Sequence, residues 1–520
     1  MLVHSCSRSA DEVQSAASTL HNATSEPIVM AIEDLVHPWL KHYTAGPQWA
    51  KTLVGGLYAW IPERLRYGPS VSVFTAEAEL RDPAALRELA QHKLATTLRW
   101  ALATVPAYAE LGIGQDQASS PYTLLARLPL LDKQALKAGL ERYCSTRLSP
   151  RQRLATHTGG STSIPMRLYL ERFVTRSKDF AFNRCFDAMV GIGPREPVFV
   201  LRGRVVPGAG AFGDRVWAYD PIRRFVHLSS DHLEPRFMPM YMAAMRRWKA
   251  RFIQAFPSAI MPLAHWLLEH PEPDITDRIA AIQLYSENTY AHQIELLKKV
   301  FQCPVYLEYG HSERAAKAIS LADDLRYFFW PAYGHTELIG ADGAPVSEPG
   351  ALGEIVVTSF DNRAMPLVRY RTGDYATLGA SNPLFPGFLA AERIEGRLQE
   401  FLVCADHRVV SICSIGAAHF DALAGAQRMQ FEQTQPGHAV LKVVADATLT
   451  PASVRALQQG VRGKTQGGVE ITVQRVSEVQ RTRAGKHLLL VQHLDVAEYL
   501  GAAGNITPPA LPGSGEDAGS

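Results

Sequence analysis

From about residue 195, the sequence alternates short apolar runs with stretches whose apolar residues have helical spacing. The runs PVFVL at 197–201, AAIQLY at 280–285 and PVYLEY at 304–309 are typical of buried strands. A helical pattern ending at Phe301 separates the last two runs. A strand, a helix and a second strand in this order predict a βαβ unit, so we expect an α/β core.

The chain has 520 residues, which is more than one hydrophobic core usually supports. After about residue 397 the pattern changes, since HAVLKVVAD at 438–446 is typical of a strand and Thr450-Pro451 is typical of a helix start. We therefore expect a large α/β domain followed by a small α+β domain. The expected boundaries are a disordered segment at 1–28, the large domain at 29–396, the small domain at 397–500 and a disordered tail at 501–520.

Charge, hydropathy and cysteine spacing exclude several classes of protein. The 53 Lys and Arg against 51 Asp and Glu leave a formal charge of +2, which gives no general attraction to nucleic acid or to an anionic membrane. No run of about 18 apolar residues occurs, so no membrane span is expected. The 6 cysteines are scattered without a C-x-x-C pair, which argues against a disulfide framework or a zinc site and favours a cytoplasmic protein.

The segment HTGGSTSIP at 157–165 is rich in small and hydroxyl residues. Such a loop allows backbone N–H groups and hydroxyls to converge on phosphate oxygens, so we interpret it as a polyphosphate site. The Walker pattern is absent, and a polar surface loop remains the alternative for this segment taken alone.

Polar residues follow two of the predicted strands, in YSE at 285–287 and EYGHSE at 308–313. Ligands of open α/β sheets bind beyond the carboxyl ends of strands, where an aromatic ring can flank adenine and a carboxylate can hold Mg²⁺. Each acidic residue, taken singly, is also consistent with a solvated charge.

Three further segments combine glycine with charged residues: YRTGD at 370–374, RIEGR at 393–397 and RTRAGK at 481–486. An aspartate after a glycine turn can accept both ribose hydroxyl protons, and arginine offers a planar fork to phosphate. A lysine beside glycine can neutralise charge that develops between a carboxylate and an α-phosphate. Surface ion pairs and an ordinary basic loop are the alternatives.

In this order and at these separations, the segments resemble the adenylate-forming superfamily of acyl-CoA synthetases, peptide-synthetase adenylation domains and luciferases. The resemblance is greatest to its phenylacetate-CoA ligase branch, with the coenzyme F390 synthetase-like and CapK-like proteins. It extends to KLATTLRWALATVPAY at 93–108, LARLPLLDKQAL at 125–136, NRAMPLVRYRTGD at 362–374 and RIEGRLQEFLV at 393–403, and it spans roughly residues 60–500.

The resemblance implies a role for each matching residue. The implied nucleotide-binding residues are Thr158, Gly160, Ser161 and Thr162 in the phosphate loop, Ser286 and Glu287 beside the adenine, Tyr309 stacked on it with Gly310 and Ser312 in the same segment, Asp374 at the ribose, and Arg393 near the domain junction. Glu313 is the implied Mg²⁺-linked glutamate, and Lys486 is the implied lysine that supports adenylation. The small domain of such enzymes rotates between two half-reactions, so it is expected to be mobile here, with Glu400 at the hinge.

The sequence departs from the pattern of the family at two of these positions. Ser163 replaces a usual glycine of the phosphate loop, and Glu400 replaces the commoner hinge aspartate. The cysteines that related branches carry are absent from 379–397, so no structural zinc is expected. A second motif, YGHTE at 333–337, is similar to the one at 309–313, but it precedes the turn DGAPVSEPG, where this branch has a strand.

The resemblance implies an acid-thiol ligase that uses ATP and Mg²⁺ to activate a carboxylic acid as acyl-AMP and then transfers the acyl group, with coenzyme A as the favoured acceptor. A carrier-protein thiol or an amine acceptor remains open, as does a nucleotide-binding homologue without catalysis, which Ser163 motivates. Either a monomer or a homodimer is compatible with the sequence. We expect the acid to bind between segments that contain Phe182, Phe186, Phe212, Trp217 and Trp266. A pocket with these rings would accept an aromatic acid.

Overall fold

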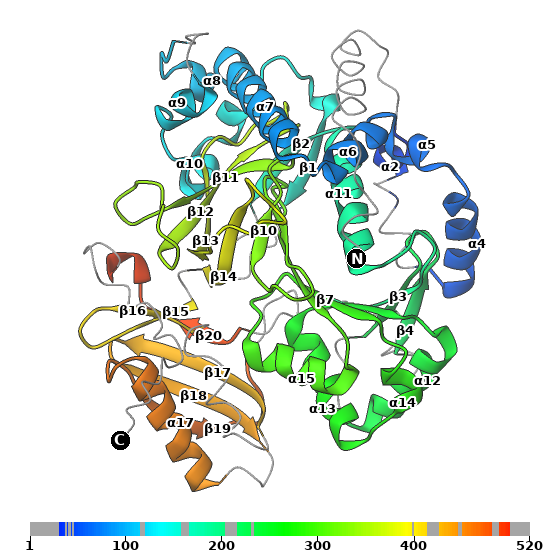
Figure 1. Cartoon of the computed structure of the whole chain (residues 1–520), viewed down its shortest axis with the longest axis vertical. Helices are drawn as coiled ribbons and strands as arrows, with labels where there is room; N and C mark the ends of the chain where they lie inside the picture. Colours follow the sequence, from blue (N-terminus) through cyan, green and yellow to red (C-terminus); the bar gives the residue numbers. More distant parts are fainter. Residues whose placement is uncertain are drawn as a thin grey trace.

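The computed structural model shows a large α/β unit with a smaller unit against one end (Figure 1). It describes residues 31–36, 39, 43, 46–114, 120–157, 166–202, 216–229, 233, 235–397, 400–412, 426–445, 450–480 and 488–499. The segments predicted to be disordered, 1–28 and 501–520, lie outside these residues. No helix in the described part of the chain has the length and apolar character needed to cross a membrane.

One sheet of twelve described strands runs through the large unit. Its order is β11 (Gly334–Ile339), β12 (Leu352–Ser359), β13 (Tyr370–Leu378), β14 (Leu389–Arg397), β10 (Tyr327–Phe329), β9 (Lys317–Ile319), β8 (Val305–Gly310), β7 (Ala281–Tyr285), β6 (Phe252–Ala255), β3 (Val198–Leu201), β5 (Phe225–Leu228) and β4 (Trp217–Asp220). The strands from β8 to β5 are parallel, whereas β8 pairs antiparallel with β9 and every pair from there to β11 is antiparallel.

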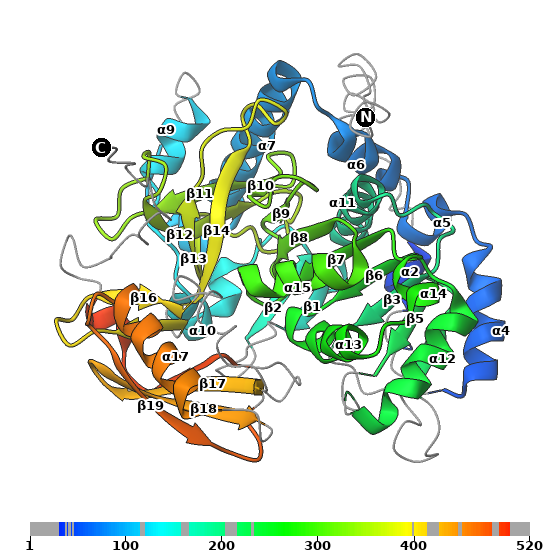
Figure 2. The same ribbon diagram turned by 60° about the horizontal axis from the view of Figure 1, so that its bottom comes forward.

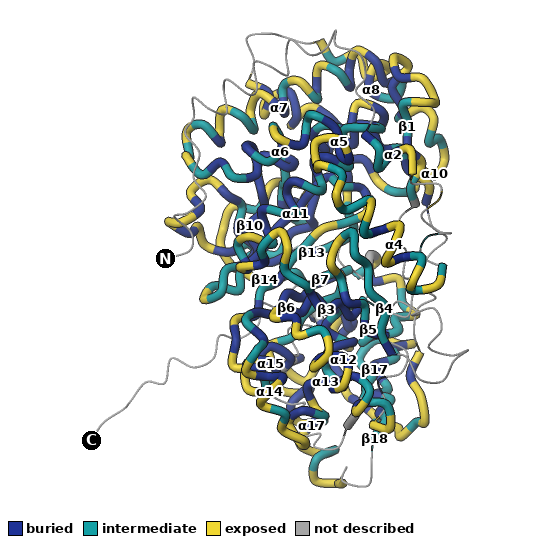
Figure 3. The backbone as a smooth tube through the Cα atoms, turned by 90° about the vertical axis from the view of Figure 1, so that its right-hand side faces the viewer, coloured by how far each residue is buried: buried dark blue, intermediate teal, exposed yellow. Residues whose placement is uncertain are grey.

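The predicted βαβ unit is confirmed as β7, α15 (Ala291–Phe301) and β8. The central parallel strands β3, β6 and β7 are buried on both faces because helices cover both sides of them. In β3, Val198 and Val200 join one core cluster, which includes residues of α6 (Ser70–Glu79) and α11 (Thr175–Val190). Phe199 and Leu201 join the other cluster, with residues of α12 (Met238–Trp248), α13 (Pro257–Glu269) and α15. Figure 3 shows β3 and β6 among the buried segments in the interior of the molecule.

The longest described helix of this unit is α7 (Pro83–Thr104), which Asp82 caps by accepting from the N–H of Ala85, with Pro83 in the first turn. The other described helices are α2 (Ile32–Val36), α4 (Gln48–Ala59), α5 (Glu63–Tyr67), α8 (Pro106–Ala109), α9 (Pro121–Ala126), α10 (Lys133–Ala138) and α14 (Pro273–Thr276), with 3-10 turns at Leu140–Tyr143, Pro150–Gln152, Pro235–Phe237 and Val496–Tyr499. A separate hairpin is formed by β1 (Arg153–His157) and β2 (Arg167–Glu171).

The smaller unit confirms the predicted α+β pattern after residue 397. Its sheet has the order β19 (Glu470–Arg475), β18 (His438–Ala445), β17 (Ala426–Gln435) and β20 (Leu490–Gln492), and α17 (Pro451–Lys464) packs on it. The side chain of Thr450 caps α17 by accepting from the N–H of Ser453. A short hairpin of β15 (Phe401–Val403) and β16 (Val409–Ser411) leads into this unit and packs on Tyr375 of β13. Figure 2 shows the unit beside the ends of β13 and β14.

Candidate active site

Two residues that the resemblance assigns to nucleotide binding, Tyr309 and Asp374, contact each other in the structure. Tyr309 is near the end of β8, and Asp374 and Arg397 pair opposite each other on β13 and β14. The chain reverses after Gly310, so the carboxyl ends of the parallel strands open beside the antiparallel strands. Open α/β sheets bind ligands beyond the carboxyl ends of their strands, and Tyr309 lies at such an end.

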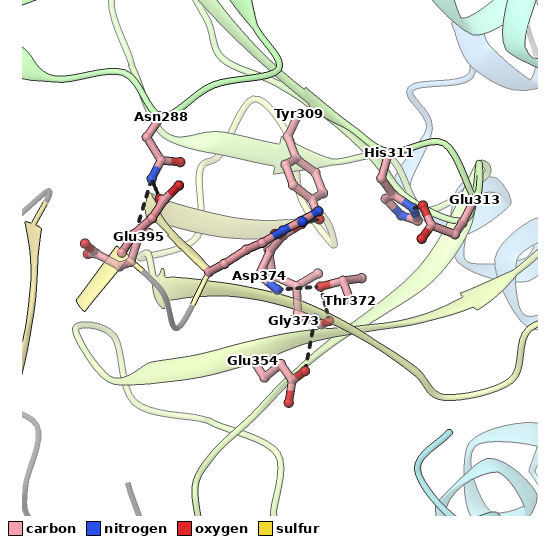
Figure 4. A network of polar contacts seen from close by, with 12 residues as sticks. Asn288, Tyr309, His311, Glu313, Glu354, Thr372, Gly373, Asp374 and Glu395 are labelled. Carbon is pink, nitrogen blue, oxygen red and sulfur yellow. Dashed lines mark hydrogen bonds and ion pairs between the residues drawn. The ribbon is translucent and has the colours of Figure 1, made fainter. Parts of the chain in front are cut away.

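Both carboxylate oxygens of Asp374 accept a hydrogen bond, and Figure 4 shows this residue beside Tyr309. The Tyr309 hydroxyl donates to Oδ2 at 2.8 Å, and Nε of Arg397 donates to Oδ1 at 3.1 Å. Burial and the neighbouring Asp374 raise the pKa of Tyr309 well above its ordinary value, so the phenol keeps its proton and remains a donor. The cluster is therefore an aspartate acceptor held between an aromatic ring and a guanidinium.

The local backbone of β13 explains why the sequence has Thr-Gly before Asp374. Gly373 has φ +78°, a conformation that favours glycine, and its N–H donates to Oε1 of Glu354 at 3.1 Å. The Thr372 hydroxyl donates to the carbonyl of Ile355 at 2.7 Å and accepts from the N–H of Asp374 at 3.0 Å. These contacts fix the direction of the aspartate side chain before any ligand binds.

Glu313 lies in a second polar group beside this cluster (Figure 4). Nδ1 of His311 donates to its Oε2 at 3.0 Å, and the hydroxyl of Tyr370 donates to its Oε1 at 3.2 Å. The N–H of Ala316 donates to Nε2 of His311 at 3.2 Å, which assigns the ring proton to Nδ1. Burial alone would raise the pKa of Glu313, but the hydrogen bond and charge of His311, followed by the backbone and Lys133, lower it to about 2, so the group is a carboxylate at neutral pH.

Lys133 also belongs to the site, although the sequence analysis did not single it out. Leu131 pairs with the edge of β13, donating to the carbonyl of Arg369 and accepting from the N–H of Arg371, both at 2.9 Å. This pairing places Lys133 near the cluster, where burial and Arg397 lower the pKa of its ammonium group. The only sequence signal for it was its place in the run LARLPLLDKQAL, which resembles the family.

Glu400 connects the start of the smaller unit to the large one. Nδ2 of Asn288 donates to its carboxyl group and to the carbonyl of Glu395. Burial, followed by the charge of Asp374, raises the pKa of Glu400 to about 8. The predicted hinge residue is thus protonated at neutral pH in this arrangement.

Ser286 and Glu287 follow β7 as predicted, but the structure shows a structural contact for the glutamate. Its carboxylate accepts from the N–H of Ser258 at 2.9 Å and from the Ser258 hydroxyl at 3.0 Å. Ser258 is in the first turn of α13, where unpaired N–H groups favour a negative charge. Glu287 therefore fixes the start of α13 against the end of β7, and Ser286 adopts φ +66° between them.

The arginine that contacts Asp374 is Arg397, whereas the sequence analysis assigned the nucleotide contact to Arg393. Nε of Arg393 donates to Oε1 of Glu395 at 3.1 Å, and that oxygen also accepts from the hydroxyl of Thr377. The register of the β13–β14 pairing shifts between the two arginines, so Arg397 lies opposite Asp374 whereas Arg393 lies opposite Thr377. The role predicted for Arg393 stays a prediction.

Several predicted residues lie outside the described part of the chain: Thr158, Gly160, Ser161, Thr162 and Lys486, together with Ser163. Their flanks are described. His157 pairs with Arg167, so the predicted phosphate loop joins the two strands of a hairpin. Gly310 ends β8, and Ser312 lies in the turn that leads to Glu313.

The residues of the second motif, at 333–337, have structural partners in the sheet. Its residues enter β11, where a Cβ on Gly334 would lie 1.8 Å from the carbonyl oxygen of Ala315. Tyr333 is buried and donates to Asp179 at 3.2 Å, and Glu337 pairs with Arg369 at 3.2 Å. These residues pack the sheet.

The aromatic residues proposed for the acid pocket have other partners. Phe182 and Phe186 are completely buried against Tyr333 and Trp330, so they form core rather than pocket wall. Trp266 stacks on His270 with ring centroids 3.8 Å apart. Trp217 packs edge-on against Trp248, and Phe212 lies outside the described residues.

The twelve-stranded sheet with a smaller α+β unit beside it is the fold of the adenylate-forming ligases, which confirms the fold that the sequence resemblance implied. Among solved structures, 2-hydroxyisobutyryl-CoA ligase bound to an acyl-AMP is similar with a TM-score of 0.60 and 16% identity, over 80% of this chain and 91% of that one. The GH3.15 acyl acid amido synthetase is similar with a TM-score of 0.52 and 12% identity, over 80% and 93% of the two chains.

Comparison of sequences gives a weaker relationship. Protein CapK of Staphylococcus aureus is 21% identical over 296 residues, which are 56% of this chain and 63% of CapK. The chain therefore matches less than two thirds of the length of this curated relative. No family model matches the chain.

Proposed function

We propose that this protein activates a carboxylic acid with ATP to form acyl-AMP and then transfers the acyl group to an acceptor, most simply the thiol of coenzyme A. The observation that carries the proposal is the partly buried Asp374 with its donors Tyr309 and Arg397, near the ionised Glu313. An adenosine whose ribose hydroxyls donate to Asp374 would stand beside the Tyr309 ring.

The residues at Glu313 fit the requirements of a Mg²⁺–ATP complex. Magnesium in such sites is held by one or two carboxylates together with substrate phosphates and water, and Glu313 offers one ionised carboxylate. No cluster of three or more His, Cys, Asp or Glu side chains suited to a metal is present in the described ranges, which agrees with a metal brought in by its nucleotide. Mg²⁺ would neutralise phosphate charge there.

In the first half-reaction, an oxygen of the acid attacks the α-phosphorus, and the bond to the β-phosphate breaks to release pyrophosphate. The protein contributes positioning and charge stabilisation, from Arg397 and Lys133 near the nucleotide and from Lys486 and the 158–165 loop as implied by the resemblance. In the second half-reaction, the acceptor attacks the acyl carbon and AMP leaves. The same adenylation machinery serves a thiol or an amine, and a CoA ligase and an amido synthetase both occur among the similar structures.

The decisive experiment is ATP–pyrophosphate exchange with the full chain against a panel of aliphatic and aromatic carboxylic acids. At least one acid should promote exchange, and Asp374→Asn should lower it by about tenfold to a hundredfold, because a weaker acceptor remains at the ribose. Asp342→Asn, in an exposed turn, is the matched control and should retain exchange. ATP binding without exchange for any acid would favour a non-catalytic nucleotide-binding protein instead.

A further measurement separates the two half-reactions. Lys486→Ala should abolish exchange yet preserve acyl transfer from a supplied acyl-AMP, since its proposed role is confined to adenylation. Supplying CoA, an amine or a carrier protein to the preformed adenylate then identifies the acceptor by the product. Normal exchange in Lys486→Ala would remove that lysine from the mechanism.

A further inference from the structure

Helix α4 (Gln48–Ala59) presents its apolar stripe to solvent. Trp49, Leu53, Leu57 and Trp60 follow one another at intervals of four, four and three residues, which places them on one side of the helix. These side chains are 71%, 59%, 67% and 88% exposed. We call these four residues the α4 stripe.

The opposite side of α4 fixes the helix in this orientation. Lys51 and Gly55 are buried there, and a Cβ on Gly55 would lie 2.3 Å from the hydroxyl of Tyr43. The Gln48 side chain donates to the carbonyl of Tyr219 at 2.8 Å and accepts from its N–H at 3.1 Å. A rolled helix would lose these contacts with β4, so the exposure of the stripe follows from how α4 is attached.

The stripe is part of an unusual concentration of exposed apolar side chains. Of the thirteen large apolar side chains that are exposed in the described ranges, nine lie between residues 35 and 65. Figures 1 and 2 place α4 at the margin of the molecule, beyond the end strand β4 of the large sheet. Scattered exposed apolar residues are normal, whereas a contiguous group of this kind marks an interaction surface.

We propose that the α4 stripe is a homodimer interface, in which α4 of two copies pack antiparallel about a two-fold axis. The exposed parts of the four side chains amount to roughly 650 Å² per copy, close to the share of about 800 Å² that one partner contributes to a standard interface. Tryptophan and leucine at helical spacing form a self-complementary surface, as an isologous contact requires.

The charge of α4 favours a second copy over a lipid surface. Lys51 is the one charged residue in the helix, and it is buried. Helices that lie on membranes have a polar face rich in Lys and Arg that contacts the headgroups, but this face of α4 packs on β4 instead. The interface is independent of the proposed ligase activity, because the stripe contributes no residue to the candidate active site.

The test is sedimentation velocity of the full chain over a wide range of concentrations. The sedimentation of the natural protein should correspond to twice the monomer mass. The double variant Leu53→Glu, Leu57→Glu should raise the dissociation constant of the dimer by roughly a hundredfold or more, because each charge enters the interface twice. Leu384→Glu is the matched control, because Leu384 is exposed to the same 59% but lies far from α4 in the chain, and it should dimerise normally. All these positions already face water, so folding of the variants is testable by circular dichroism.

A mixture of two single variants tests the geometry. Leu53→Cys mixed with Leu57→Cys should give a disulfide-linked dimer of the two variants under mild oxidation, because antiparallel stripes that overlap place Leu53 of one copy opposite Leu57 of the other. A natural protein that is monomeric at every concentration would overturn the proposal, as would a dimer unaffected by the two glutamates. Flotation of a monomeric protein with phosphatidylserine vesicles, lost in the double variant, would assign the stripe to a membrane instead.

Discussion

The buried carboxyl group of Glu400 makes the junction between the two units dependent on pH. Its pKa of about 8 compares with an ordinary value of 4.5. Below pH 4.5 the group is protonated whether the chain is folded or unfolded, so it has no effect on stability. Between pH 4.5 and about 8 the unfolded chain loses the proton and the folded chain keeps it, so stability falls as pH rises.

The substitution Glu400→Gln isolates this effect. Glutamine keeps an oxygen that can accept from Asn288 but cannot ionise. Each unit of difference between the folded and unfolded pKa changes the free energy of unfolding by about 1.4 kcal/mol. The variant should therefore become more stable than the natural protein as pH rises toward 8, by at most roughly 3 kcal/mol at pH 7. Opening of the junction would expose Glu400 and reduce this stability difference.

Thermal unfolding from pH 6 to pH 9 is the assay. The difference in melting temperature between Glu400→Gln and the natural protein should rise to about pH 8 and then level off. Glu348→Gln, in an exposed turn, is the control and should give a constant difference. A difference for Glu400→Gln that is flat, or that narrows as pH rises, would refute the reasoning.

Two further substitutions probe the site and the smaller unit. Tyr309→Phe removes the 2.8 Å hydrogen bond to Asp374 but keeps the ring, so ATP affinity measured by calorimetry should change by no more than about tenfold. A total loss of ATP binding would contradict a role that is mainly stacking. Gln430, completely buried on β17, donates to the carbonyls of Gln480 and Leu488 and so ties both ends of the 481–487 segment. Gln430→Leu should cost the smaller unit about 2–5 kcal/mol and lower exchange, measured by urea unfolding and pyrophosphate exchange; unchanged values in both would exclude this anchoring role.

The parallel half of the sheet could be predicted from the sequence because its signals are local. Each strand is a short apolar run, and α15 has its buried residues at helical spacing between two of them. The antiparallel half was harder, since the order β14-β10-β9 depends on pairings between segments far apart in the chain. Local patterns do not contain those pairings.

The candidate site joins residues that the sequence singled out with residues that it did not. Tyr309 and Asp374, which the resemblance assigned to nucleotide binding, contact each other, and each follows a recognisable strand or turn. Arg397 meets Asp374 because a register shift in β14 brings it opposite, and a linear pattern does not reveal such a shift. Lys133 reaches the site through pairing of Leu131 with β13, more than two hundred positions along the chain.

The pairing of Asp374 with Tyr309 and Arg397 also has a consequence for nucleotide selection. Tyr309 and Arg397 each donate to one oxygen, and a carboxylate has about four acceptor positions, so Asp374 can still accept from a ribose in the proposed nucleotide site. A sugar with two vicinal hydroxyls can donate to both oxygens, whereas a 2′-deoxyribose can donate to only one. The proposed site should therefore favour a ribonucleotide over a 2′-deoxyribonucleotide.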